Sequence, residues 1–244
     1  MERSSIRQSS FAVLAALIWG TTFVAQSVGA EYVPALAFNA ARSIIAFVFL
    51  LVLCLILRQV RRSSGKPATS TRSRKDLLTG GFCCGTALAL ASFFQQKGLE
   101  TTSSGKAGFI TACYIIIVPV IGIFLKKKCS PFIWIAVILS LCGLYLLCLT
   151  PGEGFAIGKG ELLVLICAVL FSLHILVIDH FSPLVDGVKM SCIQFLVCGI
   201  LSGLPALLFE SPDLAGILAA KVPILYAGVM SCGVAYTLQI VGQK

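Results

Sequence analysis

The stretch PALAFNAARSIIAFVFLLVLCLIL, from Pro34 to Leu57, decides the fold class of this protein. It is longer than the ~20 residues that a helix needs to cross the hydrocarbon core of a bilayer. Its one charged residue is Arg42. It lacks the alternating polarity of a membrane β-strand, and a backbone in lipid must satisfy its hydrogen bonds within its own helix. The stretch is therefore predicted to be a transmembrane helix.

Seven further segments have the same length and apolar character, and none of them contains Asp, Glu, Lys or Arg. Together with Pro34–Leu57 they predict an all-α integral membrane protein with eight transmembrane helices. The seven segments are Phe11–Ala30, Leu77–Gln95, Ala107–Leu125, Phe132–Leu149, Leu162–Ile178, Met190–Phe209 and Val222–Val241.

The overall composition leads to the same conclusion. Hydrophobic residues make up 58% of the 244 residues and charged residues 12%, whereas soluble domains are about 25% charged. A soluble fold of this length could not bury so much apolar surface. An ordinary cytosolic enzyme, a disordered chain and a nucleic-acid-binding module are therefore excluded.

The distribution of Lys and Arg indicates the orientation in the membrane. With a cytoplasmic N-terminus, fourteen of the 19 basic residues lie on the cytoplasmic side and four lie outside, as the positive-inside rule requires. The net charge of +9 then reflects topology and contact with anionic membrane lipid. The basic loop 58–75 has no interleaved aromatic residues, so a nucleic-acid partner is not expected. A cleaved signal peptide ending at residues 28–30 is the alternative for the first span.

The chain also contains an internal repeat. Residues 77–97 match residues 224–244 without a gap, with Gly81 opposite Gly228. We therefore expect two units, residues 1–149 with five helices and residues 150–244 with three. An odd number of spans in the first unit inserts the second unit in the opposite orientation, which is typical of secondary transporters.

The second unit has no counterpart of residues 98–149. Eight of an expected ten helices are therefore present, and completing the second unit would add about 52 residues by the logic of equivalent repeats. We expect the chain to be a truncated fragment that does not transport on its own, unless an oligomer fills the gap.

Five short motifs occur in a fixed order along the chain. They are Ile18–Phe23, Pro34 followed by Phe38–Arg42, Gln95–Thr102 continuing to Gly108–Thr111, Val118–Pro119, and Gly143–Leu147. In this order they resemble the EamA-type members of the drug/metabolite transporter superfamily.

The resemblance implies ten helices in inverted five-helix repeats and transport of small metabolites or drugs, often as export, across a bacterial-type plasma membrane. The chain departs from the family by lacking the last two helices. It also has Lys126–Lys128 where family members often carry a Glu after the fourth helix.

Polar side chains recur on shared helix faces within the predicted spans. A cavity lined by Trp, Tyr and amide side chains would suit a small zwitterion or an aromatic compound. The alternative role is hydrogen bonding between helices, worth ~0.6 kcal/mol per contact. The candidate substrate-binding residues are Trp19, Thr22, Gln26, Asn39, Arg42, Gln95, Thr111, Tyr114, Tyr236 and Gln239.

Arg42 is the sharpest of these candidates, because a charge inside a membrane is costly and suggests function. It lies about 12 Å inside Pro34 along the helix. Its guanidinium could bind a substrate carboxylate through two parallel hydrogen bonds. Alternatively, it extends toward the interface or binds helix-end carbonyls and so holds the bundle together.

His174 is the remaining titratable side chain of interest within the spans. Proton coupling is conceivable because imidazole titrates near physiological pH, and a packing role is the simpler reading. His174 and His180 lie on different helix faces, so no metal site is expected, and no cofactor motif occurs. Ten of the 11 cysteines lie inside spans and indicate small apolar packing residues.

These observations favour a secondary membrane transporter of small molecules, working by alternating access, over an enzyme. A membrane enzyme acting on a lipid-linked substrate is the first alternative, and a nonfunctional or regulatory fragment is the second. The expected location is the plasma membrane, multi-pass, with a cytoplasmic N-terminus. The oligomeric state stays open.

The charge distribution predicts that the loop following Pro34–Leu57 is cytoplasmic. A cysteine introduced at Ser64 should not react with a membrane-impermeant reagent in intact cells and should react after permeabilisation. Labelling of intact cells would reverse the orientation.

Overall fold

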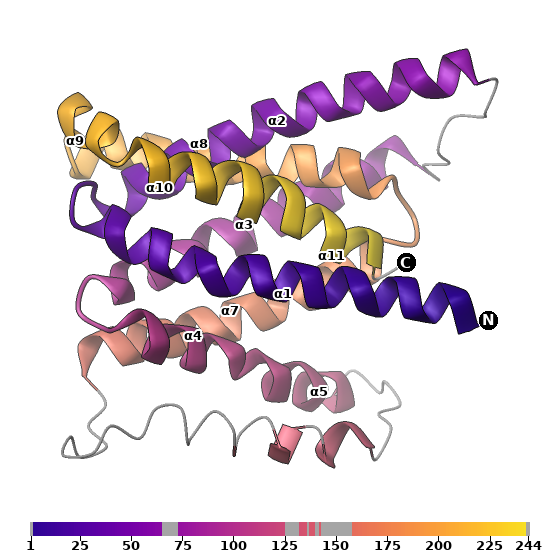
Figure 1. Ribbon diagram of the computed structural model, residues 1–244, viewed down its shortest axis with the longest axis horizontal. Coiled ribbons are helices and arrows are strands. Elements are labelled where there is room, and N and C mark those ends of the chain that lie inside the picture. Colours follow the sequence, from indigo (N-terminus) through magenta and orange to yellow (C-terminus); the bar gives the residue numbers. More distant parts are fainter. Residues whose placement is uncertain are drawn as a thin grey trace.

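The computed structural model describes residues 2–64, 73–124, 132–135, 137–139, 142 and 158–242. Every regular element in these ranges is helical, and the longer helices run nearly parallel in one bundle (Figure 1). In chain order the elements are α1 (Glu2–Ala30), α2 (Ala35–Ser63), α3 (Arg74–Leu99), α4 (Ser104–Ala112), α5 (Tyr114–Phe124), α7 (Lys159–Phe181), α8 (Gly187–Phe209), α9 (Leu214–Ala219), α10 (Lys221–Tyr226), the π-helix η1 (Ala227–Ala235) and α11 (Tyr236–Gly242).

Seven helical stretches in the described residues are long and apolar enough to cross a membrane. The predicted all-α integral membrane fold is therefore confirmed. The seven stretches correspond to seven of the eight predicted spans, and most of Phe132–Leu149 lies outside the described residues. The matching stretches are Ser10–Ala30, Ala35–Ser63, Arg74–Leu99, Ser104–Phe124, Lys159–Phe181, Gly187–Phe209 and Lys221–Val241.

The bundle is apolar on both its inner and outer surfaces, as expected of a protein whose solvent is lipid. Large side chains such as Leu17 and Phe209 are exposed on the outside. Small side chains such as Ala46, Ala91 and Cys167 are fully buried inside. Small residues allow the helix backbones to approach closely, which is how helices gain packing energy in a membrane.

The fourth predicted span is interrupted at Cys113, between α4 and α5. The amide of Cys113 donates to the carbonyl of Ile110, and the amide of Ile116 donates to that of Cys113, at 3.1 and 2.9 Å. These bonds connect residues three apart, so the helix tightens locally into a 3₁₀-like turn. The turn separates Thr111, in α4, from Tyr114, in α5.

The last predicted span is helical throughout, but its middle is the π-helix η1. This segment packs its backbone on α2. A Cβ atom built on Gly228 would lie 2.8 Å from a methyl carbon of Ile45 and 2.9 Å from the carbonyl oxygen of Arg42. A π-turn holds more residues than an α-turn, and each extra residue rotates the following helix by about 100°. η1 therefore sets the direction in which α11 presents its side chains.

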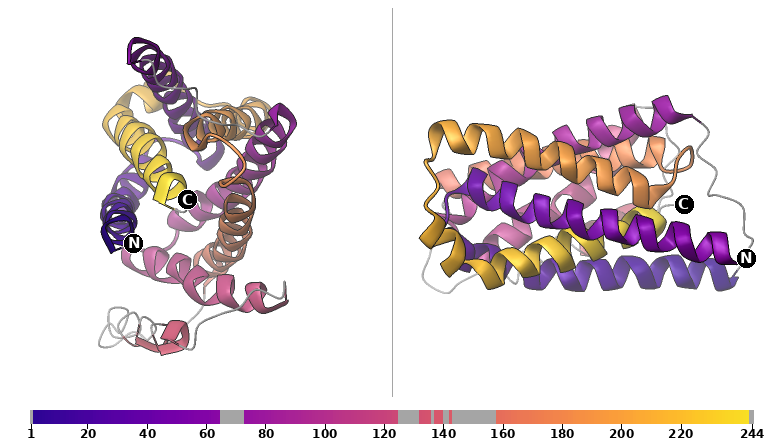
Figure 2. Two further views of the ribbon diagram at one scale, coloured as in Figure 1. Left: turned by 90° about the vertical axis from the view of Figure 1, so that its right-hand side faces the viewer. Right: turned by 90° about the horizontal axis from the view of Figure 1, so that it is seen from above.

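Helices α2 and α8 pack along each other. α3 packs on α7 and α8, and η1 packs on both α2 and α1. α11 packs on α1. Seen along their axes, the helices enclose the middle of the bundle from several sides (Figure 2).

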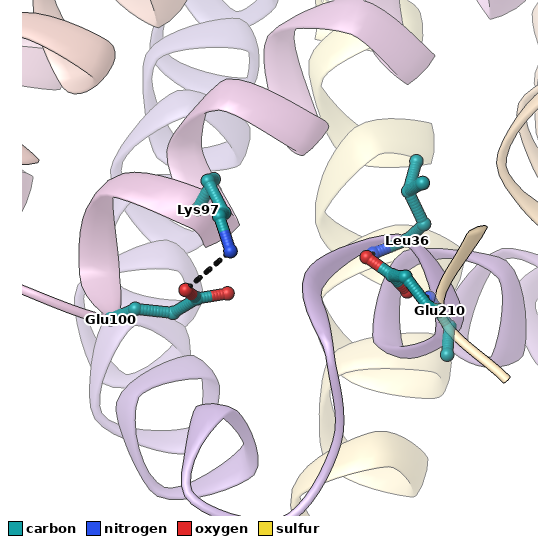
Figure 3. Close-up of polar contacts among 5 residues, drawn as sticks. Leu36, Lys97, Glu100 and Glu210 are labelled. Carbon is teal, nitrogen blue, oxygen red and sulfur yellow. Dashed lines mark hydrogen bonds and ion pairs between the residues drawn. The ribbon is translucent and has the colours of Figure 1, made fainter. Parts of the chain in front are cut away.

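A side chain from α8 caps the first turn of α2. The preceding residue, Pro34, has no side-chain acceptor for the free amides of that turn. The Glu210 carboxylate accepts instead from the amides of Leu36 and Ala37, at 3.0 and 2.8 Å (Figure 3). These are the amides that a local capping side chain would bind, and the negative charge also suits the helix dipole.

The opposite ends of the two helices also meet. Asp186 caps the start of α8 by accepting from the amides of Val188 and Lys189. The same carboxylate lies 3.8 Å from the guanidinium of Arg61, in the last turn of α2. α2 and α8 are therefore antiparallel and are joined at both ends by a carboxylate.

We predict that Glu210→Ala destabilises the protein by about 1 kcal/mol, the usual cost of losing a helix cap. For a chain of this size that is a fall of about 2–4 °C in melting temperature, measurable by thermal unfolding in detergent. Glu100→Ala is the matched control, because Glu100 binds the exposed Lys97 at 2.7 Å near the same end of the bundle (Figure 3). Exposed ion pairs contribute little. An equal loss in both variants would contradict the capping role.

Candidate functional site

A cavity of about 360 Å³ lies between α1, α5, α7 and α11. The residues of α1 that line it come from the first half of the transmembrane part of that helix, so the cavity lies toward the end of the bundle that holds the N-terminus (Figure 1). Its volume falls within the range of small-molecule sites. Its polar lining residues are Trp19, Tyr114 and Gln239, and its apolar ones are Ala12, Ala15, Ala16, Ile115, Val118, Pro119, Ile175 and Leu238.

Two polar atoms of the cavity-lining residues have no hydrogen-bond partner in the described part of the chain. They are the indole nitrogen of Trp19 and the amide oxygen of Gln239, and both are buried. The first can only donate a hydrogen bond and the second can only accept one. Buried polar atoms in proteins are nearly always bonded, so two of the residues that line the cavity each hold a polar atom that lacks its usual partner.

Tyr236 lies beside the cavity and joins it to the core. Its ring makes edge-on contacts with Trp19, Phe195 and His174, with centroid separations of 5.1, 5.5 and 5.8 Å. It is the first residue of α11, immediately after η1, so the π-helix determines where this ring lies. A movement of Trp19 would therefore be transmitted through Tyr236 to His174.

A cluster of amide side chains joins α1, α3 and α4 farther along the bundle. The Gln26 amide nitrogen donates to the side-chain oxygens of Gln95 and Gln96, at 3.0 and 3.1 Å. Gln96 donates back to the carbonyl of Gln26 at 2.9 Å, and Gln95 donates to the hydroxyl of Thr111 at 3.3 Å. All four side chains are buried. Gln26 lies seven residues beyond Trp19, about 10 Å along α1, so the cluster closes the bundle on that side of the cavity.

Arg42 does not line the cavity. Its Nε donates to the side-chain oxygen of Asn39 at 3.0 Å, and Asn39 in turn donates to the Ser202 hydroxyl of α8 at 2.8 Å. The guanidinium also lies 5.8 Å from the ring centroid of Phe38. Arg42 is only 5% exposed and forms no ion pair with a carboxylate of the described residues. It is close enough to Tyr236 to interact electrostatically with its hydroxyl.

The structure thus divides the predicted site residues into groups. Three line the cavity, and Tyr236 lies next to it. Gln26, Gln95 and Thr111 form the amide cluster, while Asn39 and Arg42 lie at the contact of α2 with α8. The hydroxyl of Thr22 donates to the carbonyl of Ile18 in its own helix, at 2.7 Å.

Gln96 was missing from the predicted set, although it bonds Gln26 in both directions. Two consecutive glutamines within an apolar span were the available signal. Both are buried, and their hydrogen bonds join α3 to α1 and to α4.

Fold and cavity together define a polytopic helical membrane protein with a mostly apolar cavity between four of its helices. Residues 8–149 match the EamA-like transporter family. The chain belongs to this family, as its motifs predicted.

Two relatives illustrate the similarity. An uncharacterized transporter of Archaeoglobus fulgidus is 32% identical over 195 residues, which cover 78% of this chain and 54% of the relative. The chain thus spans about half the length of that protein. A solved structure described only as the crystal structure of a protein matches 97% of this chain and 79% of its own, with a TM-score of 0.71 and 21% identity, which shows a shared fold.

Proposed function

We propose that this transporter moves small metabolites or drugs by alternating access, with the cavity between α1, α5, α7 and α11 as its substrate site. The observation that carries the proposal is the pair of buried, unpartnered polar atoms on Trp19 and Gln239 in an otherwise apolar cavity. A substrate with an apolar or aromatic body, carrying one hydrogen-bond acceptor and one donor, would satisfy both atoms.

The amide cluster supports this proposal, because its hydrogen bonds would hold the bundle closed on one side of the cavity. It links three helices by four hydrogen bonds, and it lies farther than the cavity from the N-terminal end of the bundle. With a cytoplasmic N-terminus, the cluster would be the outer gate and the cavity would face the cytoplasm. Transport would then require these bonds to break as the cavity closes on the inner side.

The packing of the helices supports two inverted units. α1 and α7 would be equivalent first helices, and α3 would be equivalent to the span formed by α10, η1 and α11. The structure packs α3 on α7 and packs α1 on η1 and α11, which is the pairing that a twofold relation predicts. α2 and α8, the equivalent second helices, would lie on the axis.

Arg42 supports the further proposal that the substrate carries an anionic group. A buried guanidinium in lipid is costly unless a negative charge compensates it, and its protein partner here is the neutral Asn39. Arg42 also interacts electrostatically with Tyr236, whose ring contacts the cavity-lining Trp19. A carboxylate passing Tyr236 would reach the guanidinium during the transport cycle.

The cavity offers little to the alternative of a membrane enzyme. General acid–base catalysis needs a titratable pair close to the substrate. The described lining of the cavity contains no Asp, Glu, His or Lys.

The test begins with a thermal-stabilisation screen of the purified protein against amino acids, sugars and nucleosides, followed by uptake of each hit in vesicles that carry the product of the intact gene. Gln239→Leu should lower uptake by about 10-fold or more, because removing the partner of a buried polar group costs ~1–3 kcal/mol. Gln59→Leu, at an exposed position of α2, is the matched control and should transport normally. Normal uptake by Gln239→Leu would rule out the cavity as the substrate site.

Arg42→Lys tests the anionic group separately. Lysine keeps the charge but cannot offer the planar pair of donors, so uptake should largely disappear while the protein still inserts and folds. Arg58→Lys, farther along the same helix and exposed, should be silent. Full transport by Arg42→Lys would remove Arg42 from substrate recognition, and loss of folded protein would assign it to the α2–α8 contact alone.

A further inference from the structure

The chain has two histidines, both on α7, and the structure places them in opposite environments. His174 lies within the span and is completely buried. His180 lies in the last turn, is exposed, and stacks edge-on against Phe181 at 4.8 Å. A titratable side chain fully buried inside a membrane span is costly unless it has a function.

The hydrogen bonding of His174 is incomplete. Its Nε2 lies 3.2 Å from the side-chain oxygen of Gln194, on α8. Among the described residues its Nδ1 has no partner, and neither has the amide nitrogen of Gln194. With the proton on Nε2, the imidazole donates to Gln194 and the Nδ1 lone pair is free to accept a proton.

His174 is also coupled to the proposed substrate site. The next residue, Ile175, lines the cavity. The imidazole contacts the ring of Tyr236, which contacts the cavity-lining Trp19. A rotation of α7 that widened the cavity at Ile175 would therefore bring His174 toward water.

No counter-ion holds a charge on His174 in this conformation. Among the described residues, the titratable groups on neighbouring helices are the hydroxyls of Tyr114 on α5 and Tyr236 on α11, and thiols on α3 and α8. The cation Arg42, from α2, lies beside Tyr236. On α7 itself, Asp179 and His180 are at the exposed end and Cys167 is two turns away. The described contacts of His174 include no carboxylate.

We propose that His174 is a proton-binding switch that makes the opening of the cavity depend on pH, a role that rests on the alternating access proposed above. In the conformation described, the imidazole is neutral and closed off from water. In a conformation that opens α7, Nδ1 takes a proton from water and the imidazolium is hydrated. Return to the closed conformation favours loss of that proton, because burying an unpaired imidazolium is costly and, unlike the Arg42 guanidinium, an imidazolium readily loses its proton.

Thermodynamic linkage makes this coupling reciprocal. A proton that binds only the open conformation shifts the population toward it, and closing releases the proton. A lower pH would then favour the open conformation, and a higher pH the closed one.

The test uses the whole chain in lipid nanodiscs and needs no substrate. With ¹³C-labelled histidine, the two side chains give two NMR signals, and His180→Gln identifies the one that belongs to His174. Titration from about pH 4 to about pH 9 covers the range in which an imidazole responds. We expect His174 to show a one-proton transition, and an invariant signal while His180 titrates in the wild type would overturn the proposal.

The coupling to the cavity is read from Trp19. The other tryptophan is Trp134, so Trp134→Phe leaves Trp19 as the single tryptophan. In this background the fluorescence of Trp19 should change with the midpoint found for His174. The change should be lost in His174→Gln, which can keep a hydrogen bond to Gln194, and kept in His180→Gln.

A pH-independent Trp19 signal, or one that persists in His174→Gln, would overturn the proposal. If His174→Gln fails to fold, the comparison of midpoints in the Trp134→Phe protein still decides it. If these tests fail, the proposed substrate site is not contradicted, because its role is tested separately by uptake in the Gln239→Leu variant. If His174 titrates but none of the screened compounds is taken up, the result would instead contradict the proposed transport function.

Discussion

The contact between α2 and α8 is the interaction on which the rest of the bundle depends. The two helices are antiparallel, and α3 and η1 pack directly on them. In lipid there is no hydrophobic force to hold helices together, so close packing and hydrogen bonds must do it. Here these are the Asn39–Ser202 bond inside the membrane and the carboxylates of Glu210 and Asp186 at the two ends. Because both ends are fixed, we expect this pair to stay in place while the surrounding helices move.

The cavity and the amide cluster lie on the other side of the bundle, among helices with fewer such restraints. α5 contacts α7 beside the cavity, and α1 meets α11 along its length. The hydrogen bonds of the amide cluster join neutral side chains, so they can break and re-form at modest cost. Among the described residues, the α2–α8 contact is thus tied at both ends, whereas the contacts of the amide cluster are between neutral side chains.

The sequence predicted the membrane fold well because its signal is local. Whether a segment such as Pro34–Leu57 spans a bilayer depends on its own length and polarity, since its backbone N–H and C=O groups must form their hydrogen bonds within the same helix. The family resemblance was predictable for a similar reason, because its motifs are short and ordered along the chain. The site was predicted less completely. Polar residues in the spans were found, but those of the cavity, the amide cluster and the α2–α8 contact could not be told apart.

What the sequence by itself determined is therefore the class of protein, its spans and the set of polar residues that lie within them. The tertiary structure alone decided which of those residues meet. The π-helix η1 turns α11 so that Tyr236 faces Trp19, and one residue fewer in its turns would rotate that face by about 100°. Such rotations follow from how glycines like Gly228 pack on α2. That packing depends on residues far apart in the chain, so it cannot be predicted from hydropathy or from the spacing of residues along one helix.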